Sequence, residues 1–288
     1  MTMRARVIHL LSILIASWLL SCDVITPPYT RTVVQDTTQP DTGMARYHKV
    51  LIEEFTGVQC TNCPIGHRKL ADLAMVYGDS IVIVSIHAGE FARPNASKGY
   101  PTDFRTPAGE ELNTRFRVFA YPAAVIDRSK IDGTSFVVGV QNWGSAIARQ
   151  LRASTPIAIE THAFADTLSG QLAIRVRLQS LAAIEYPLNI GYYIVEDSVV
   201  APQLDNGTYV PDYIHRHVLR DAPLGAYGKP LITSQTPAGT TITRTYTYTL
   251  RDVTWNRRQL EVVVFIARPE PDYTVVQCQK SHVAFGQK

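Results

Sequence analysis

The sequence predicts an α/β domain followed by an all-β antiparallel sandwich. In the first half, the strand-like run Val50 to Phe55 leads through Cys60 and Cys63 into a helix-like run, and the β-branched run Ile81 to Ile86 follows. Strand, helix and strand in that order indicate a right-handed βαβ unit. In the second half, strand-like runs alternate apolar with polar residues and no useful helical period separates them.

The first 21 residues are predicted to be a signal peptide. A start carrying Arg4 and Arg6 precedes the apolar stretch Val7 to Leu20, which is too short to be a comfortable membrane span. The ending Leu-Leu-Ser-Cys resembles the bacterial lipobox, which implies that Cys22 becomes a lipid-modified N-terminus anchored by acyl chains. The alternative is an ordinary signal peptide with Cys22 near the cut by chance.

Length and charge set the domain count and exclude one class of partner. Without the signal peptide, which holds Arg4 and Arg6 and no acid, the formal net charge falls from +3 to about +1, so we expect no nucleic-acid partner. The mature chain exceeds a typical single domain, which favours two. We predict a lipidated Cys and a Thr/Pro-rich tether over 22–46, the α/β domain over 47–154 and the sandwich over 155–288.

The remaining elements of the α/β domain follow from local patterns. Apolar residues after the cysteines at Leu70, Leu73, Ala74 and Tyr77 have the spacing of a helix packed on a sheet. Thr106-Pro107 followed by two acids is typical of a helix start. Further on we predict a hairpin turn over 131–134, a strand over 135–138 and a helix over about 141–153.

The two cysteines have the chemistry of a redox dithiol. A Cys at a helix N-terminus has its thiolate stabilised by unpaired backbone N–H groups and by the helix dipole. Cys60 is therefore the natural attacking thiol, and Cys63 would resolve the mixed disulfide. Pro64 costs the helix little at its first turn.

The order of elements, with Cys-x-x-Cys at the first βα junction and Tyr121-Pro122 before a late strand, resembles the thioredoxin fold over roughly Lys49 to Ser154. The resemblance implies that Glu54 is a buried acid that handles the resolving thiol's proton, for which a raised pKa would suit it. It also implies that Pro122 is a cis-proline and that Tyr121 pairs its backbone with a bound peptide. Gln59 and the pair Thr61-Asn62 depart from the usual pattern and leave the direction of electron flow open.

A more specific resemblance spans almost the whole mature chain. Glu-Glu-Phe-Thr-Gly-x-x-Cys-x-Asn-Cys-Pro-x-Gly-His, with the later Val-Glu-Asp and His-x-His-Val-Leu-Arg segments, is similar to the outer-membrane lipoprotein family of Bacteroidota named after a twenty-eight-kilodalton founder. This resemblance implies a lipid-anchored outer-membrane protein whose role is that of an adhesin or receptor. It implies no defined enzymatic activity.

Alternative interpretations stay open for each of these site residues. Cys60 and Cys63 could form a permanent structural disulfide, or a copper or zinc site with His67 and His87, although the spacing of His67 argues against metal. Glu54 could be an acid tolerated at a strand edge, and the bond before Pro122 could be trans. We predict neither a metal nor a cofactor.

The second half is predicted to be an immunoglobulin-like sandwich. Its strand-like runs are 157–161, 172–178, 188–195, 246–250 and 260–267. Between them, the polar and aromatic stretch Asp205 to Tyr227 is predicted to be a recognition loop. In that stretch, His215 and His217 would share one face of a strand, where surface or packing roles are favoured over metal binding. Cys278 is predicted to be a small buried hydrophobe.

Two function classes remain. One is thiol-disulfide exchange on exported proteins, in which Cys60 attacks, Cys63 resolves and Glu54 manages protons. The other is a surface-binding lipoprotein for a host or cell-surface ligand, in which the disulfide is only a staple. The sequence does not identify which face of the membrane the protein occupies.

Overall fold

The computed structural model describes residues 43–130, 133–250 and 254–286, in which strands hold more residues than helices. The α-helices are α2 (Cys63–Tyr77), α3 (Pro107–Arg115) and α4 (Trp143–Gln150). The strands before residue 154 are β1 (Val50–Thr56), β2 (Ile81–His87), β3 (Ala123–Ile126) and β4 (Val137–Gly139). The predicted signal peptide, Cys22, most of the tether and the turn residues 131–132 lie outside the described residues.

The later part of the chain contributes ten strands. They are β5 (Ile157–Asp166), β6 (Gln171–Ser180), β7 (Leu188–Glu196), β8 (Val199–Asp205), β9 (Thr208–His215), β10 (Val218–Asp221), β11 (Lys229–Ile232), β12 (Thr241–Thr249), β13 (Leu260–Ala267) and β14 (Val275–Gly286). Four of the five runs predicted to be strands in this half lie wholly within β5, β6, β7 and β13, and the run 246–250 ends one residue beyond β12.

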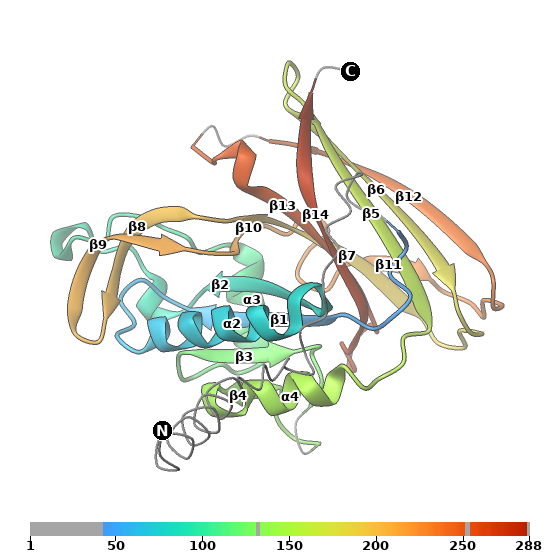
Figure 1. Cartoon of the computed structure of the whole chain (residues 1–288), viewed down its shortest axis with the longest axis horizontal. Coiled ribbons are helices and arrows are strands. Elements are labelled where there is room, and N and C mark those ends of the chain that lie inside the picture. The colour runs from blue at the N-terminus through green and yellow to red at the C-terminus, as the bar shows by residue number, and fades with distance from the viewer. Residues whose placement is uncertain (1–42, 131–132, 251–253, 287–288) are drawn as a thin grey trace, which may run out of the picture. The chain divides into compact units, whose positions relative to one another are not determined.

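Twelve of the strands form one mixed sheet, in the order β12-β6-β5-β14-β13-β7-β10-β2-β1-β3-β4, with β11 paired to β7 (Figure 1). β1 and β2 are parallel, as predicted, and β3 and β4 continue the sheet in antiparallel pairs. The predicted fold class is wrong. There is no separate thioredoxin-like α/β domain followed by an independent sandwich, because strands from both halves of the chain share this sheet.

The connection between the halves has a simple physical cause. Every residue of β2 is buried, so both edges of this strand need hydrogen-bonding partners. β1 pairs with one edge, and β10 pairs with the other, where Val218 lies opposite Ser85 and the Ser85 amide donates to the His217 carbonyl over 2.7 Å. β10 lies in the stretch that the sequence predicted to be a loop, and this part of the prediction is also wrong.

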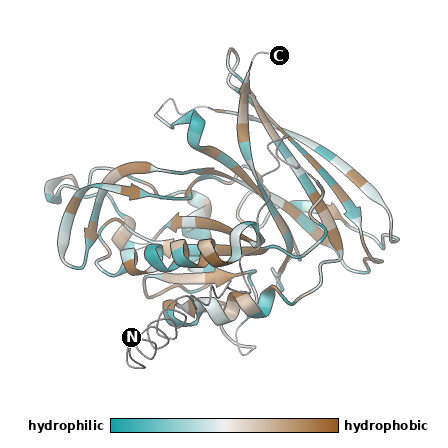
Figure 2. Cartoon of the chain, in the orientation of Figure 1, coloured by the Kyte–Doolittle hydropathy of each residue, from teal (hydrophilic) through white to brown (hydrophobic). Residues whose placement is uncertain are grey.

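Apolar side chains form cores on both faces of the central strands. Hydrophobic residues are accordingly frequent along these strands (Figure 2). One core joins Phe55 and Ile86 to Leu112 of α3 and Phe265 of β13, and the opposite core packs α2 and α4 against the sheet around Trp143. A third core is enclosed by strands β5, β6, β7 and β13, which face one another as the two layers of a sandwich do. The sandwich prediction is therefore partly supported.

The helix starts follow the sequence signals. α2 carries Pro64 in its first turn, and the Thr106 hydroxyl accepts a hydrogen bond of 3.0 Å from the Gly109 amide at the start of α3. α4 is shorter than the predicted helix.

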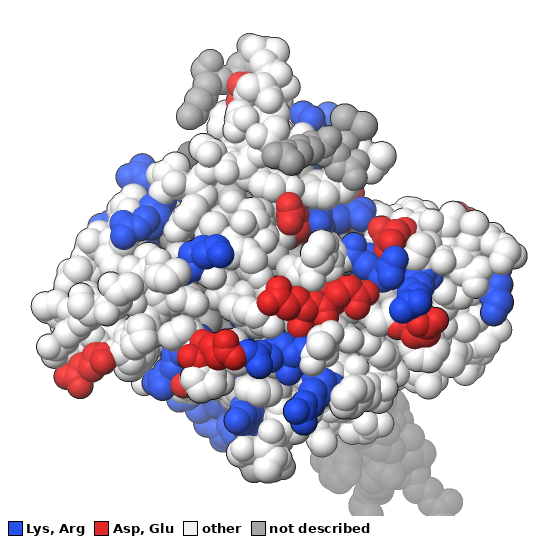
Figure 3. Space-filling model, turned by 180° about the vertical axis from the view of Figure 1, so that it is seen from behind, with Lys and Arg blue, Asp and Glu red and all other residues white. Residues whose placement is uncertain are grey.

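The surface carries charges of both signs. On the face shown in Figure 3, basic and acidic side chains lie beside one another. Among the residues that the structure describes, no helix is long and apolar enough to cross a membrane.

Candidate functional site: a buried disulfide beneath a hairpin

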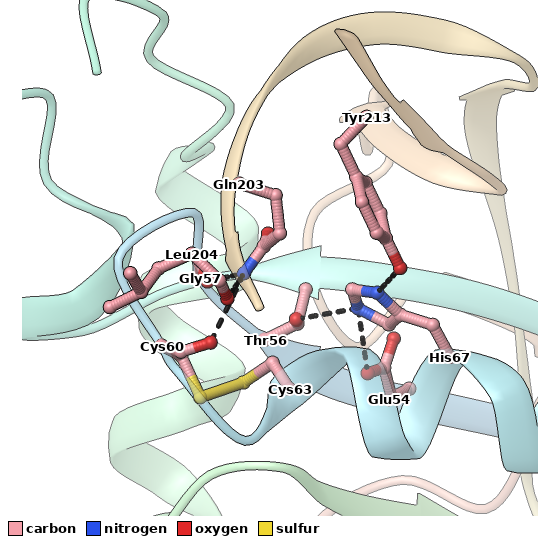
Figure 4. Close-up of a disulfide and its surroundings, with 9 residues drawn as sticks. All are labelled: Glu54, Thr56, Gly57, Cys60, Cys63, His67, Gln203, Leu204 and Tyr213. Atoms are coloured by element: carbon pink, nitrogen blue, oxygen red, sulfur yellow. Dashed lines mark hydrogen bonds and ion pairs between the residues drawn. A yellow bond between two sulfur atoms is a disulfide. The ribbon is translucent and has the colours of Figure 1, made fainter. Parts of the chain in front are cut away.

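Cys60 and Cys63 form a disulfide at the point where the loop after β1 enters α2 (Figure 4). The loop is tight, because the Cys60 amide donates to the Gly57 carbonyl over 3.0 Å and the Cys63 amide donates to the Cys60 carbonyl over 3.3 Å. Both cysteines are buried, with 4% of Cys60 and 0% of Cys63 exposed. A reagent in solution therefore reaches the disulfide only if the segments that cover it move.

Glu54 lies two residues before the end of β1, with a fully buried side chain. Neither of its carboxyl oxygens has a hydrogen bond of good geometry to a described residue. Its polar neighbour is His67 of α2, whose Nε2 lies 3.3 Å from Oε1 of Glu54. The prediction that Glu54 is a buried acid matches this position, whereas its role stays a prediction.

Both ring nitrogens of His67 have partners. Nε2 lies 2.9 Å from the hydroxyl oxygen of Thr56, and Nδ1 lies 2.7 Å from the hydroxyl of Tyr213. Burial raises the pKa of Tyr213 to about 12, so its hydroxyl stays a neutral donor and acceptor at physiological pH. The result is a polar chain from the interior of the sheet through His67 to β9 (Figure 4).

The hairpin of β8 and β9 covers the disulfide loop. Its strands form a separate two-stranded sheet. The Leu204 amide donates to the Val58 carbonyl over 2.9 Å, and the Asn206 amide donates to the Thr61 carbonyl over 2.9 Å. Nε2 of the fully buried Gln203 lies 3.1 Å from the Cys60 carbonyl and 3.3 Å from the Gly57 carbonyl (Figure 4).

Side chains fix the same hairpin at its edges. Arg68 of α2 pairs with Asp205 over 2.9 Å, and the Tyr209 hydroxyl donates to the Gly99 carbonyl over 3.1 Å. Sequence reasoning missed this element, although its signal is present. Asn206-Gly207 is the dipeptide of a two-residue hairpin turn, and both residues have the positive φ that such a turn requires.

The Tyr121–Pro122 peptide bond is cis, as the resemblance implied. Pro122 lies against the first turn of α2, where a Cβ added at Gly66 would meet the Pro122 ring at 2.9 Å. The Tyr121 hydroxyl donates to Oδ1 of Asn113 over 2.6 Å, and its ring lies edge-on to Phe91 at 6.0 Å. Half-buried Tyr121 and Pro122 therefore lie close to the helix that begins at Cys63.

The remaining histidines are not grouped as the alternative metal sites would require. His87 and His215 are buried with ring centroids 5.4 Å apart, and burial lowers the pKa of His87 and brings that of His215 to about 4. His217 follows β9 with a positive φ, so it does not share a strand face with His215. Within the described ranges, no group of three or more His, Cys, Asp or Glu side chains is arranged to hold a metal ion.

Cys278 is a buried free thiol, as the sequence predicted. Burial raises its pKa well above the ordinary value, and its Sγ lies 3.3 Å from the Lys49 carbonyl. A thiol in this state is a poor nucleophile.

A cleft of about 180 Å³ opens beside this site, between α2 and the segment joining β9 to β10. Polar side chains from α2, β2, β9 and the segment after β9 line it, namely those of His67, Arg68, Ser85, Tyr213, Arg216 and His217. His67 and Tyr213 therefore connect the buried Glu54 to a space that opens on the surface.

The sheet, the hairpin and the covered disulfide define a class of mixed-sheet proteins with a buried Cys-x-x-Cys disulfide. The model of the family described as outer membrane protein Omp28 matches residues 110–287 of this chain. This chain belongs to the Omp28 family, and its predicted location at the outer membrane is confirmed. Lipidation of Cys22 stays a prediction.

Two solved structures from Porphyromonas gingivalis are similar to this chain. HBP35 has a TM-score of 0.66 and 15% identity, over 84% of this chain and 77% of HBP35, and it supports the continuous-sheet fold. A domain of the outer membrane lipoprotein Omp28 has 18% identity and a TM-score of 0.32, over 46% of this chain and 92% of that domain. No curated protein matches the sequence.

Proposed function

We propose that this outer membrane protein carries out thiol-disulfide exchange on exported proteins through Cys60 and Cys63. The observation that carries the proposal is the disulfide at the N-terminus of α2. Unpaired backbone N–H groups and the helix dipole at this place stabilise a thiolate, which is the reactive form of cysteine. The buried Glu54 with its partner His67 supports the same proposal, because thiols gain and lose protons in each exchange cycle.

The proposed reaction is balanced by the partner's own thiols. A partner thiolate attacks Sγ of Cys60, the Cys60–Cys63 bond breaks, and Cys63 leaves as a thiolate that takes up a proton. The second partner thiol then displaces Cys60 and closes the partner's disulfide. The cycle runs in reverse when the partner is the oxidant. In both directions the hairpin of β8 and β9 has to move, because it covers Cys60.

A second candidate function is a surface-binding protein in which the disulfide is a structural staple. One specific observation favours it: both cysteines are almost completely buried beneath a hairpin that is hydrogen-bonded to their loop. In this case the bond fixes the loop on which the hairpin rests, and binding takes place elsewhere.

The equilibrium reduction potential of the Cys60–Cys63 pair separates the two functions. We expect a value above about −300 mV, since structural disulfides of exported proteins lie below that level. We also expect the full chain to reduce or oxidise a model disulfide protein, and the Cys60→Ser variant to lose this activity. A bond that resists dithiothreitol until the protein unfolds would favour the staple.

A further inference from the structure

His67 is the polar link between the buried carboxyl of Glu54 and the surface. On one side its Nε2 faces Oε1 of Glu54 at 3.3 Å, and on the other its Nδ1 lies 2.7 Å from the Tyr213 hydroxyl. Thr56 holds the ring in this orientation through its contact of 2.9 Å with Nε2. An imidazole bound in this way can take a proton at one nitrogen and release a proton from the other.

Glu54 is cut off from water except through this ring. Its side chain is 0% exposed, and among the described residues its oxygens have no hydrogen bond of good geometry. The side chain of His67 is 18% exposed, and His67 and Tyr213 both line the cleft between α2 and the β9–β10 segment. A proton that reaches Glu54 from solvent therefore has its shortest polar route through Tyr213 and His67.

We infer that His67 is a positioning residue that carries protons between Glu54 and Tyr213 each time the Cys60–Cys63 bond opens or closes. This inference rests on the proposed exchange function. When the bond opens, Glu54 gives a proton to the Cys63 thiolate, Nε2 of His67 returns a proton to Glu54, and Nδ1 is resupplied through the Tyr213 hydroxyl. When the bond closes, each transfer runs in reverse, so protons and electrons balance with the partner dithiol alone.

The test compares variants with wild type because several charged and titratable groups surround His67. The charged and titratable groups around His67 are Glu54 on β1, His87 on β2, Arg68 on α2, Asp205 on β8, Tyr213 and His215 on β9, and Arg216 and His217 at the cleft. Burial lowers the pKa of His87 and of His217, and it lowers the pKa of His215 to about 4. It raises the pKa of Tyr213 to about 12. These groups are the same in wild type and in the single variants, so a difference in rate at a given pH reports on the residue that was changed.

The test is the rate at which dithiothreitol reduces the disulfide of the full chain between pH 5 and pH 9. We expect His67→Gln to slow reduction at least tenfold near neutral pH, a smaller effect than the roughly 100-fold that direct proton transfer commonly contributes. We also expect Glu54→Gln to slow reduction to a similar extent, and Tyr213→Phe to have an intermediate effect. Added imidazole should restore part of the rate of His67→Ala.

A matched control is His162→Gln. His162 of β5 is also paired with a glutamate, Glu160, over 3.1 Å, but its side chain is half-exposed. This variant should have the pH profile of wild type after correction for the ionisation of the dithiothreitol thiols, which affects all variants equally. If His67→Gln and wild type have the same pH profile while the disulfide exchanges normally, the role of His67 is refuted and the exchange function stands. If dithiothreitol cannot reduce the folded wild type, the exchange function itself fails.

Discussion

Arg128 and Glu53 form a bidentate ion pair that is completely buried within the sheet. Nε of Arg128 lies 2.9 Å from Oε2 of Glu53, Nη2 lies 2.7 Å from Oε1, and neither side chain is exposed. The Tyr193 hydroxyl of β7 donates to Oε1 of Glu53 over 2.7 Å, and Arg128 Nη2 donates to the Ala226 carbonyl over 2.9 Å. The pair therefore connects β1 to the strands contributed by the second half of the chain.

Arg128→Ala should lower the free energy of unfolding by about 3–5 kcal/mol, because it leaves the Glu53 carboxylate buried without its cation. Arg128→Lys should also be costly, since an ammonium lacks the planar fork of two nitrogens that pairs with both carboxylate oxygens. Denaturant unfolding measures both changes. The control is Arg177→Ala, which removes a half-exposed pair with Glu160 at 3.7 Å and should cost no more than about 1 kcal/mol. An equal loss in Arg128→Ala and Arg177→Ala would contradict this account.

Local patterns in the sequence predicted the elements around the disulfide but not the sheet that they join. Val50–Thr56 and Ile81–His87 are strands almost as predicted, because apolar and β-branched residues at consecutive positions suit strands buried on both faces. The pairing of Val218 with Ser85 joins residues far apart in the chain, and no local pattern records it. The two halves were consequently predicted to be separate domains.

The sequence likewise predicted one part of the candidate site and missed another. Cys60, Cys63 and Glu54 come from one short stretch whose order places them together, and they do lie around the start of α2. Gln203 and Tyr213 come from a hairpin whose docking depends on long-range contacts. The dipeptide Asn206-Gly207 indicates a hairpin turn, but no local pattern indicates the surface on which the hairpin packs.

The pair His48 and Asp127 should make stability depend on pH. Burial disfavours the charged imidazole of His48, but the hydrogen bond of 2.8 Å and the charge of Asp127 outweigh it and raise its pKa. A raised pKa gives stability that is fully present below the unfolded value of about 6.5 and is lost as the pH rises through the folded value. Burial raises the pKa of Asp127 as well, so its slope has the same sign.

Replacing Asp127 should reverse this dependence. In Asp127→Asn, burial of His48 is no longer opposed by a carboxylate, so the pKa of His48 should fall below its ordinary value. Wild type should lose stability as the pH rises above about 6.5, and the variant should gain stability as the pH rises toward that value, each by at most about 1.4 kcal/mol per pH unit. Urea unfolding from pH 5 to 9 measures the slopes. A wild-type stability that does not fall above about pH 6.5, or that falls as much in Asp127→Asn, would rule out this explanation.

Gln203 should control access to the disulfide. Its buried amide holds the carbonyls of Gly57 and Cys60, and each such hydrogen bond is worth about 1 kcal/mol. Gln203→Ala should loosen the hairpin and speed reduction by dithiothreitol about tenfold, which corresponds to about 1.4 kcal/mol. Gln171→Ala, which removes an exposed hydrogen bond to Thr249, should leave the rate unchanged. An unchanged rate in Gln203→Ala would mean that the hairpin does not limit access.

Gly57 should tolerate no side chain, because backbone atoms of the neighbouring segment occupy the space. A Cβ at Gly57 would lie 2.5 Å from the carbonyl carbon of Phe91 and 2.7 Å from the amide nitrogen of Ala92, and backbone cannot rotate away as a side chain can. Gly57→Ala should therefore displace the loop that carries Cys60 and destabilise the protein by about 1–3 kcal/mol.

The matched control for this substitution is Gly144→Ala in α4. The new Cβ would lie 3.7 Å from Leu73, an ordinary van der Waals distance, and alanine favours a helix by up to about 1 kcal/mol over glycine. This variant should therefore be neutral or stabilised in thermal unfolding, whereas Gly57→Ala should melt at a lower temperature. If Gly57→Ala melted with wild type and kept its disulfide equally resistant to dithiothreitol, the loop could move at little cost. The cover over Cys60 would then have to depend on the hairpin contacts alone.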